Sequence, residues 1–158
     1  MAAAICLGEL LINFVPTVTS TGLIDAPAFI KAPGGAPGNV AVGLARLGVH
    51  SAFMGKVGDD PFGHFLADTL AAAGVDVDPL RFSTEARTAL TFVSPRADGE
   101  REFMFYRHPS ADRLFTPREV DVDAIGRAQF LHFGSISLIG EPSRSATLYA
   151  VDAARAAD

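Results

Sequence analysis

The chain has 158 residues, which is the length of one domain or of a large part of one. Apolar residues make up 49% of it, and 13 basic against 18 acidic residues give a formal net charge of −5. The basic residues are scattered, which argues against nucleic acid as a partner. A single cysteine excludes a disulfide framework and indicates a reducing compartment. Because no apolar run reaches the ~18 residues of a membrane span and no charged leader pattern opens the chain, we expect a cytosolic protein without membrane contact.

The first predicted element is a core strand over residues 5–12, which are apolar except for Gly8 and Glu9. Cys6 is interpreted as a buried residue of this strand. Residues 17–22 form a polar loop, and 22–32 are expected to add one or two short strands.

A glycine-rich loop over 34–38 then leads into a helix predicted over 39–47. Apolar residues recur there at helical spacing, and Gly48 is a suitable stop. With three glycines, the loop lets a ligand approach the main chain, and the helix start directs free N–H groups into the same space. Asn39 adds a donor and an acceptor, which suits a polyol. The alternative is an ordinary loop in which Asn39 caps the helix.

A second strand and helix follow in the same order. Residues 51–57 predict a core strand, and the next helix runs to about residue 73, with Asp60 as its cap and Pro61 in its first turn. Lys56 is interpreted as a charge at the strand end, and Asp59 with Asp60 as turn residues.

Two strand-like runs, 89–95 and 101–107, flank Asp98-Gly99 and predict a hairpin with Phe103 and Phe105 on one face. The rest reads as a short helix over 121–128, a third apolar strand over 129–136 and a last helix over 142–157. His132 is expected to be a hydrogen-bonded core residue. Strands alternating with helices, and a hairpin inserted between them, predict an α/β core with a small β flap.

Common nucleotide and metal motifs are missing. No Gly-x-Gly-x-x-Gly follows a strand, and residues 48–57 lack the spacing and the hydroxyl of a P-loop. The four histidines show no metal-binding spacing.

Several motifs together resemble the ribokinase-like (phosphofructokinase-B type) carbohydrate kinases, and plant-type fructokinases in particular. The glycine-loop motifs of this resemblance are Gly34-Gly-Ala-Pro-Gly-Asn-Val-Ala, Leu47-Gly48 and Gly55-Lys-Val-Gly-Asp-Asp-Pro-Phe-Gly63. The others are Gly8-Glu-Leu-Leu-Ile-Asn-Phe-Val-Pro16, Arg87-Thr-Ala-Leu, Arg96-Ala-Asp-Gly-Glu-Arg-Glu-Phe103, Phe105-Tyr-Arg-His-Pro-Ser-Ala-Asp112 and His132-Phe-Gly-Ser-Ile-Ser-Leu138.

The resemblance implies one partial kinase domain over 1–158. It would have a Rossmann-type sandwich core, a mostly parallel sheet with helices on both faces, and a β lid from about 21–33 and 89–107 that closes over fructose or a similar hexose. It also implies ATP and Mg²⁺ as cofactors of the family. The sugar-binding residues that it suggests are Asn13, Gly34, Gly35, Asn39, Arg107 and Asp112.

The sequence departs from this pattern at Asn13, where the family has an aspartate. A charged acceptor makes hydrogen bonds worth about 1.5–3 kcal/mol, against about 0.5–1.5 for a neutral one. We therefore expect weakened sugar binding.

The chain is also about half as long as these kinases. Their second half carries the Gly-x-Gly-Asp catalytic base, the Asn-x-x-Glu magnesium-associated motif and the adenine pocket, and no such motif follows His132. We therefore expect the C-terminal part of the core, and the catalytic residue with it, to be missing. Binding of ATP by this chain is then doubtful, and we expect no activity of the chain alone. An unpaired sheet edge should result, open to a homodimer or heterodimer contact there or through the lid. The alternatives are a non-catalytic sugar-binding or kinase-interacting homologue, or an incomplete product.

Overall fold

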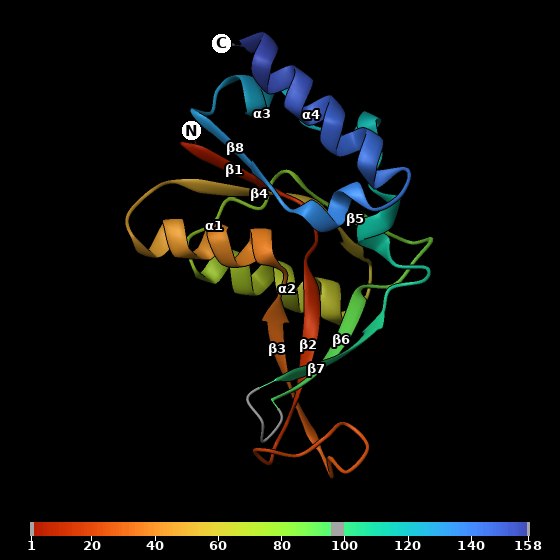
Figure 1. The fold of residues 1–158 in the computed structure, drawn as a ribbon. Coiled ribbons are helices and arrows are strands. Elements are labelled where there is room, and N and C mark those ends of the chain that lie inside the picture. The colour runs from red at the N-terminus through yellow and green to blue at the C-terminus, as the bar shows by residue number, and fades with distance from the viewer. Residues whose placement is uncertain (1, 96–99, 158) are drawn as a thin grey trace.

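The computed structural model describes residues 2–95 and 100–157, whose strands form two four-stranded sheets (Figure 1). The core sheet is parallel, in the order β5-β4-β1-β8. The small sheet has the order β3-β2-β6-β7, in which only β2 and β6 are parallel. The core strands are β1 (Ala4–Leu7), β4 (Ser51–Gly58), β5 (Leu80–Ser83) and β8 (Phe130–Phe133). Those of the small sheet are β2 (Leu11–Pro16), β3 (Phe29–Gly34), β6 (Ala89–Pro95) and β7 (Arg101–Tyr106).

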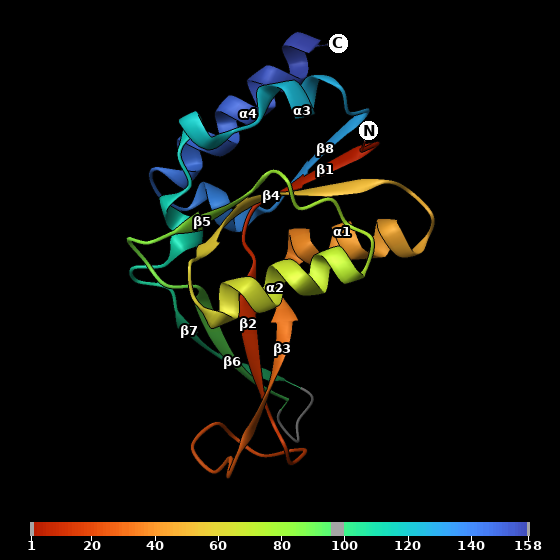
Figure 2. The same ribbon diagram turned by 180° about the vertical axis from the view of Figure 1, so that it is seen from behind.

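Helices cover both faces of the core sheet, as predicted. In Figures 1 and 2, α1 (Ala36–Arg46) and α2 (Pro61–Ala72) lie on one face, and α3 (Val122–Gly126) and α4 (Ser143–Ala157) lie on the other. Three short 3₁₀ helices complete the fold: η1 (Ala111–Leu114), η2 (Pro117–Glu119) and η3 (Ser135–Leu138).

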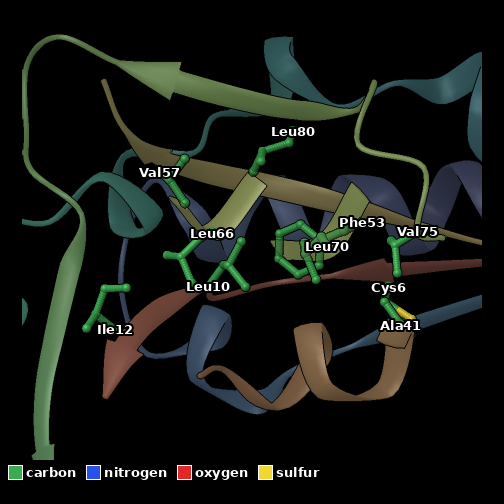
Figure 3. Packing of buried hydrophobic residues seen from close by; sticks show 10 residues of the cluster. All are labelled: Cys6, Leu10, Ile12, Ala41, Phe53, Val57, Leu66, Leu70, Val75 and Leu80. Atoms are coloured by element: carbon green, nitrogen blue, oxygen red, sulfur yellow. The ribbon is translucent and has the colours of Figure 1, made fainter. Parts of the chain in front are cut away.

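The core strands are apolar on both sides because each side packs on a helical layer. Cys6 and Phe53 pack with Leu66 and Leu70 of α2 (Figure 3), whereas Ile5 and its neighbours on the opposite side pack against α4. The prediction for Cys6 is confirmed, since its side chain is fully buried. Burial raises the pKa of its thiol to about 11, which keeps the thiol protonated.

The prediction of one strand over 5–12 is wrong. The chain leaves the core sheet after Leu7 and enters the small sheet at Leu11. Gly8 makes this change of direction with a φ of +147°, a conformation that favours glycine. Residues 11–16 therefore belong to the small sheet rather than to the core.

The first helix begins three residues earlier than predicted. Ala36 is its first residue, and Pro37 lies in the first turn, where its missing N–H costs no helical hydrogen bond. Asn39 is therefore one turn inside the helix and does not cap it. Gly48, with a φ of +82°, follows the helix end as expected.

The predicted hairpin strands are present, because Pro95 to Leu90 pair with Arg101 to Tyr106 in antiparallel register. Phe103 and Phe105 stack on one face, with ring centroids 5.8 Å apart. The predicted turn at Ala97-Asp98-Gly99 lies outside the described residues.

The third core strand is present, but His132 is not a core residue. Within the described part of the chain β8 pairs only with β1, so it forms the sheet edge. His132 is exposed there, and Phe130 is 68% exposed. The prediction for His132 fails because no described strand pairs with the outer side of β8. No helix in the described residues has the length and apolar character needed to cross a membrane.

Lys56 is more than a charge at a strand end. Its ammonium lies 2.7 Å from a carboxylate oxygen of Glu119 and donates to the Leu114 carbonyl oxygen at 3.2 Å. Burial acts to raise the pKa of Glu119, but the hydrogen bonds from Lys56 and Thr116 outweigh it and lower that pKa. This ion pair fixes η1 and η2 against β4.

Asp60 joins the core to the small sheet. Its carboxylate caps α2 by accepting from Phe62 N and Gly63 N at 3.0 and 2.9 Å. It also accepts from the N–H and the hydroxyl of Thr88, directly before β6, at 2.8 and 2.9 Å. Burial acts to raise the pKa of Asp60, but these four hydrogen bonds prevail and lower it.

Replacing Asp60 by alanine should lower the free energy of unfolding by about 1–3 kcal/mol, because the α2 cap and the Thr88 link are lost together. A lowered native-state pKa means that the ionised form contributes stability above the unfolded pKa of ~3.9. The wild-type advantage should therefore be complete above that pH and fade as the pH falls below it. Urea unfolding of both proteins at several pH values measures the difference.

Asp59→Ala is the matched control, because the neighbouring Asp59 is half exposed and, among the described residues, its carboxylate pairs only with His64, at 2.8 Å. An exposed pair of this kind contributes about 0–1 kcal/mol. Equal losses in the two variants would contradict the role given to Asp60.

Candidate functional site

The candidate site lies at the carboxyl ends of β1 and β8. From β1 the chain passes through β2 and β3 to α1 on one face of the core sheet, and from β8 through η3 to α4 on the other (Figure 1). In open α/β sheets, ligands bind at such a point, where neighbouring strands connect to opposite faces. Glu9 and Gly134 lie within two residues of these strand ends.

The Gly34-Gly35 turn is held against the protein itself. Gly35 has a φ of +109° and precedes α1 as its N-cap, and a Cβ on it would overlap the Glu9 carbonyl oxygen. A Cβ on Gly34 would overlap the Asn13 amide. Gly35 therefore requires glycine, whereas a side chain at Gly34 would have to displace the Asn13 and Leu11 side chains. The contact of the turn with the protein itself adds a second reason for glycine to the approach of a ligand considered from the sequence.

Glu9 is a site residue that the sequence analysis missed. Its side chain is 3% exposed, and Oε1 accepts a hydrogen bond from the N–H of Ala36 at 3.0 Å. Gly35, as N-cap, has no side chain for this purpose, so Glu9 supplies the cap from the end of β1. Oε2 is buried beside Gly134 and has no partner among the described residues. The signal was available, since Glu9 is the one charged residue in an otherwise apolar run.

Asn13 lies in β2 between Ala32 of β3 and Thr91 of β6. Residues directly opposite in register share a face of the sheet, so Asn13 and Thr91 present their polar groups side by side. The Thr91 side chain is buried at 2% exposure, and Oγ1 has no hydrogen-bond partner in the described structure. Thr91 was not predicted, because a single hydroxyl in a strand carries no distinctive pattern.

Asn39 and Gly34 line one cavity of about 320 Å³ between α1 and α2. The Asn39 side chain is exposed, and its backbone N–H donates to the Gly35 carbonyl oxygen at 3.0 Å. Asn13 contacts the same turn through Gly34. The structure thus brings together four of the six predicted residues around the start of α1.

Arg107 and Asp112 form a second group. They are an ion pair whose side chains are 12% and 3% exposed, and Ser110 Oγ donates to Asp112 Oδ1 at 2.6 Å. The Ala111 N–H donates to the Arg87 carbonyl oxygen at 2.9 Å, which ties this segment to the chain before β6. The described hydrogen bonds and ion pairs do not join this pair to Asn13 or Asn39.

The group around the start of α1 offers side-chain amides, backbone N–H groups, the buried hydroxyl of Thr91 and the carboxylate of Glu9. These are donors and acceptors that suit a polyol site. No three His, Cys, Asp or Glu side chains gather within residues 2–95 and 100–157 in a way that could hold a metal ion.

Comparison with known proteins gives consistent relatives. The chain is 59% identical over 153 residues to "Fructokinase" of Solanum tuberosum, covering 97% of this chain and 48% of that protein. It is 60% identical to "Probable fructokinase-7" of Arabidopsis thaliana, covering 97% and 45%. The chain therefore spans about half the length of the curated relatives it matches.

Solved structures share the fold over almost the whole chain. The fructokinase of Xylella fastidiosa matches with a TM-score of 0.87 and 40% identity over 99% of this chain and 48% of that one. A sugar kinase of Pyrococcus horikoshii, solved in complex with ATP, matches with a TM-score of 0.89 and 34% identity over 94% and 48%.

The model of the pfkB family carbohydrate kinases matches residues 1–158. The expected ribokinase-like α/β fold is thus confirmed, and the chain belongs to the pfkB family of carbohydrate kinases.

Proposed function

We propose that this chain binds fructose, or a hexose of similar shape, and serves its ATP-dependent phosphorylation in the cytosol. The observation that carries the proposal is the Gly34-Gly35 turn, which brings Asn13, Asn39 and the start of α1 to one place. The fructokinase relatives support the choice of sugar.

The turn suits a sugar because its polar groups are fixed before the ligand arrives. The Asn13 amide makes no hydrogen bond with other described residues, so it can both donate to and accept from sugar hydroxyls. Glu9 holds the first turn of α1, so its remaining free N–H groups keep their direction. Preorganisation of this kind lowers the entropic cost of binding.

We assign the role of lid to the small sheet. Of the two ranges that the sequence suggested for a lid, 21–33 and 89–107, the sheet contains β3, β6 and β7, and β2 is its fourth strand. Closure over the sugar would exclude water, so that a sugar hydroxyl rather than water accepts the phosphoryl group.

We assign the catalytic base, the ATP phosphates and Mg²⁺ to none of the described residues. Phosphoryl transfer depends on charges placed around the phosphate, and the candidate site offers one buried carboxylate and neutral groups. Asn13, Gly34, Gly35 and Asn39 thus serve the sugar, and Arg107 with Asp112 is placed at the border of the sugar pocket.

We place an oligomer contact at the edge strand β8 or at strand β7. All residues of β7 are exposed to solvent, and so are most of those of β8. Sedimentation of the protein at several concentrations measures it, and a monomer at all concentrations would exclude it.

Calorimetric titration with fructose tests the proposal. A saturable binding isotherm with one-to-one stoichiometry is expected for fructose. Glycerol at equal concentration should show no binding, because it is too small to contact all the polar groups of the sugar site. Absence of binding with fructose, glucose and ribose alike would exclude the function.

Asn13→Asp should bind fructose about tenfold more tightly, because a carboxylate forms hydrogen bonds about 1 kcal/mol or more stronger than an amide does. The same titration measures the effect, with Asn13→Ala as the opposite control, which should bind more weakly than wild type. Equal affinity of wild type and Asn13→Asp would refute this role of Asn13.

Glu9→Ala should weaken fructose binding about tenfold or more and lower the free energy of unfolding by about 1–3 kcal/mol, because the Ala36 N–H is left without a partner. Glu9→Gln should recover most of the affinity, since its amide oxygen can accept the same hydrogen bond. If folded Glu9→Ala binds fructose as wild type does, Glu9 serves stability alone and does not position the turn.

A further inference from the structure

A second cavity, of about 160 Å³, lies between the segment after β7 and the start of α4, and its lining includes no residue of the glycine turn. The two segments adjoin in both Figure 1 and Figure 2. Arg107, His108 and Arg113 line one side, and Ile136, Gly140 and Ser143 are among the residues on the other. Two guanidinium groups and an imidazole thus share a space that has no acidic lining residue.

Arg107 brings an unused donor to this cavity. Its Nη2 is engaged by Asp112, and its side chain is only 12% exposed. Its Nε is buried and has no hydrogen-bond partner among the described residues. A buried charged donor without an acceptor costs free energy, so such a group indicates a missing partner.

Arg113 brings a charge that no carboxylate balances within the described residues. Its Nη1 donates to His108 Nε2, and its Nη2 lies so close to Gly140 that a Cβ there would come within 2.9 Å. The acidic residues adjacent in sequence to Arg113 and Gly140 are engaged elsewhere. Asp112 pairs with Arg107, and Glu141 accepts from Ser145 N at 3.2 Å and lies 3.7 Å from Arg144.

The start of α4 adds to the positive potential. Ser143 is the first residue of this 15-residue helix and lines the cavity. The N-terminal end of a helix carries a partial positive charge that favours an anion. This contribution supports the two guanidinium groups and would not define a site without them.

We propose that this cavity binds a phosphate group, with Arg107 Nε and Arg113 as its donors. Guanidinium groups that approach from two residues suit the several oxygens of a tetrahedral anion. A space of about 160 Å³ fits one phosphate group and excludes a nucleotide. The group can belong to inorganic phosphate or to a sugar phosphomonoester. The inference does not depend on fructose being the substrate.

Calorimetric titration of the protein with inorganic phosphate at constant ionic strength tests the site. One-to-one saturable binding is expected, and Arg113→Gln should weaken it at least tenfold. Arg118→Gln is the matched control, since Arg118 is an exposed arginine that does not line the cavity and its loss changes the net charge equally. It should change the dissociation constant less than twofold. Glycerol 3-phosphate as a second titrant shows whether a phosphomonoester binds better than free phosphate, because glycerol itself is not expected to bind.

Circular dichroism shows whether Arg113→Gln is folded. If it is not, Arg113→Lys replaces it, and a folded Arg113→Lys should bind phosphate more weakly than wild type. Absence of saturable binding, or equal weakening by the Arg113 and Arg118 variants, would overturn the proposal. Fructose titration of Arg113→Gln reports the sugar site separately, so failure of one proposal leaves the other testable.

Discussion

The close contact between the Gly34-Gly35 turn and the end of β1 is the constraint on which the site depends. Any side chain at Gly35 would collide with the Glu9 carbonyl, and the Glu9 carboxylate in turn holds the first N–H of α1. One residue therefore fixes both the turn and the helix start. The direction of Asn39, one turn further on, follows from this arrangement.

The two sheets are connected through few but well-satisfied polar contacts. Asp60 links α2 to the residue before β6, and the carbonyl of Arg87 in the same segment accepts the N–H of Ala111. Residues 87 and 88 thus tie both α2 and the segment that carries Arg107 and Asp112 to the start of β6 in the small sheet.

Sequence patterns predicted the parts of this fold that local chemistry decides. Apolar runs, the Asp60-Pro61 helix start and the glycine stop after α1 are all visible in single segments. The failures were tertiary. A break at Gly8 between two sheets, the exposed position of His132 on an edge and the short strand β5 depend on neighbours far away in the sequence. Of the candidate site, the glycines and Asn39 were proposed from their own chemistry and Asn13 from the family resemblance, whereas Glu9 and Thr91 emerged only when burial and missing partners were known.

The central claim is that a sugar rests on the glycine turn and the first turn of α1. Amide hydrogen exchange with and without fructose tests it most directly, because each backbone N–H reports its own protection. Fructose should slow exchange at residues 34–39 and leave the second half of α4 unchanged. Fructose that binds without protecting residues 34–39 would contradict the account.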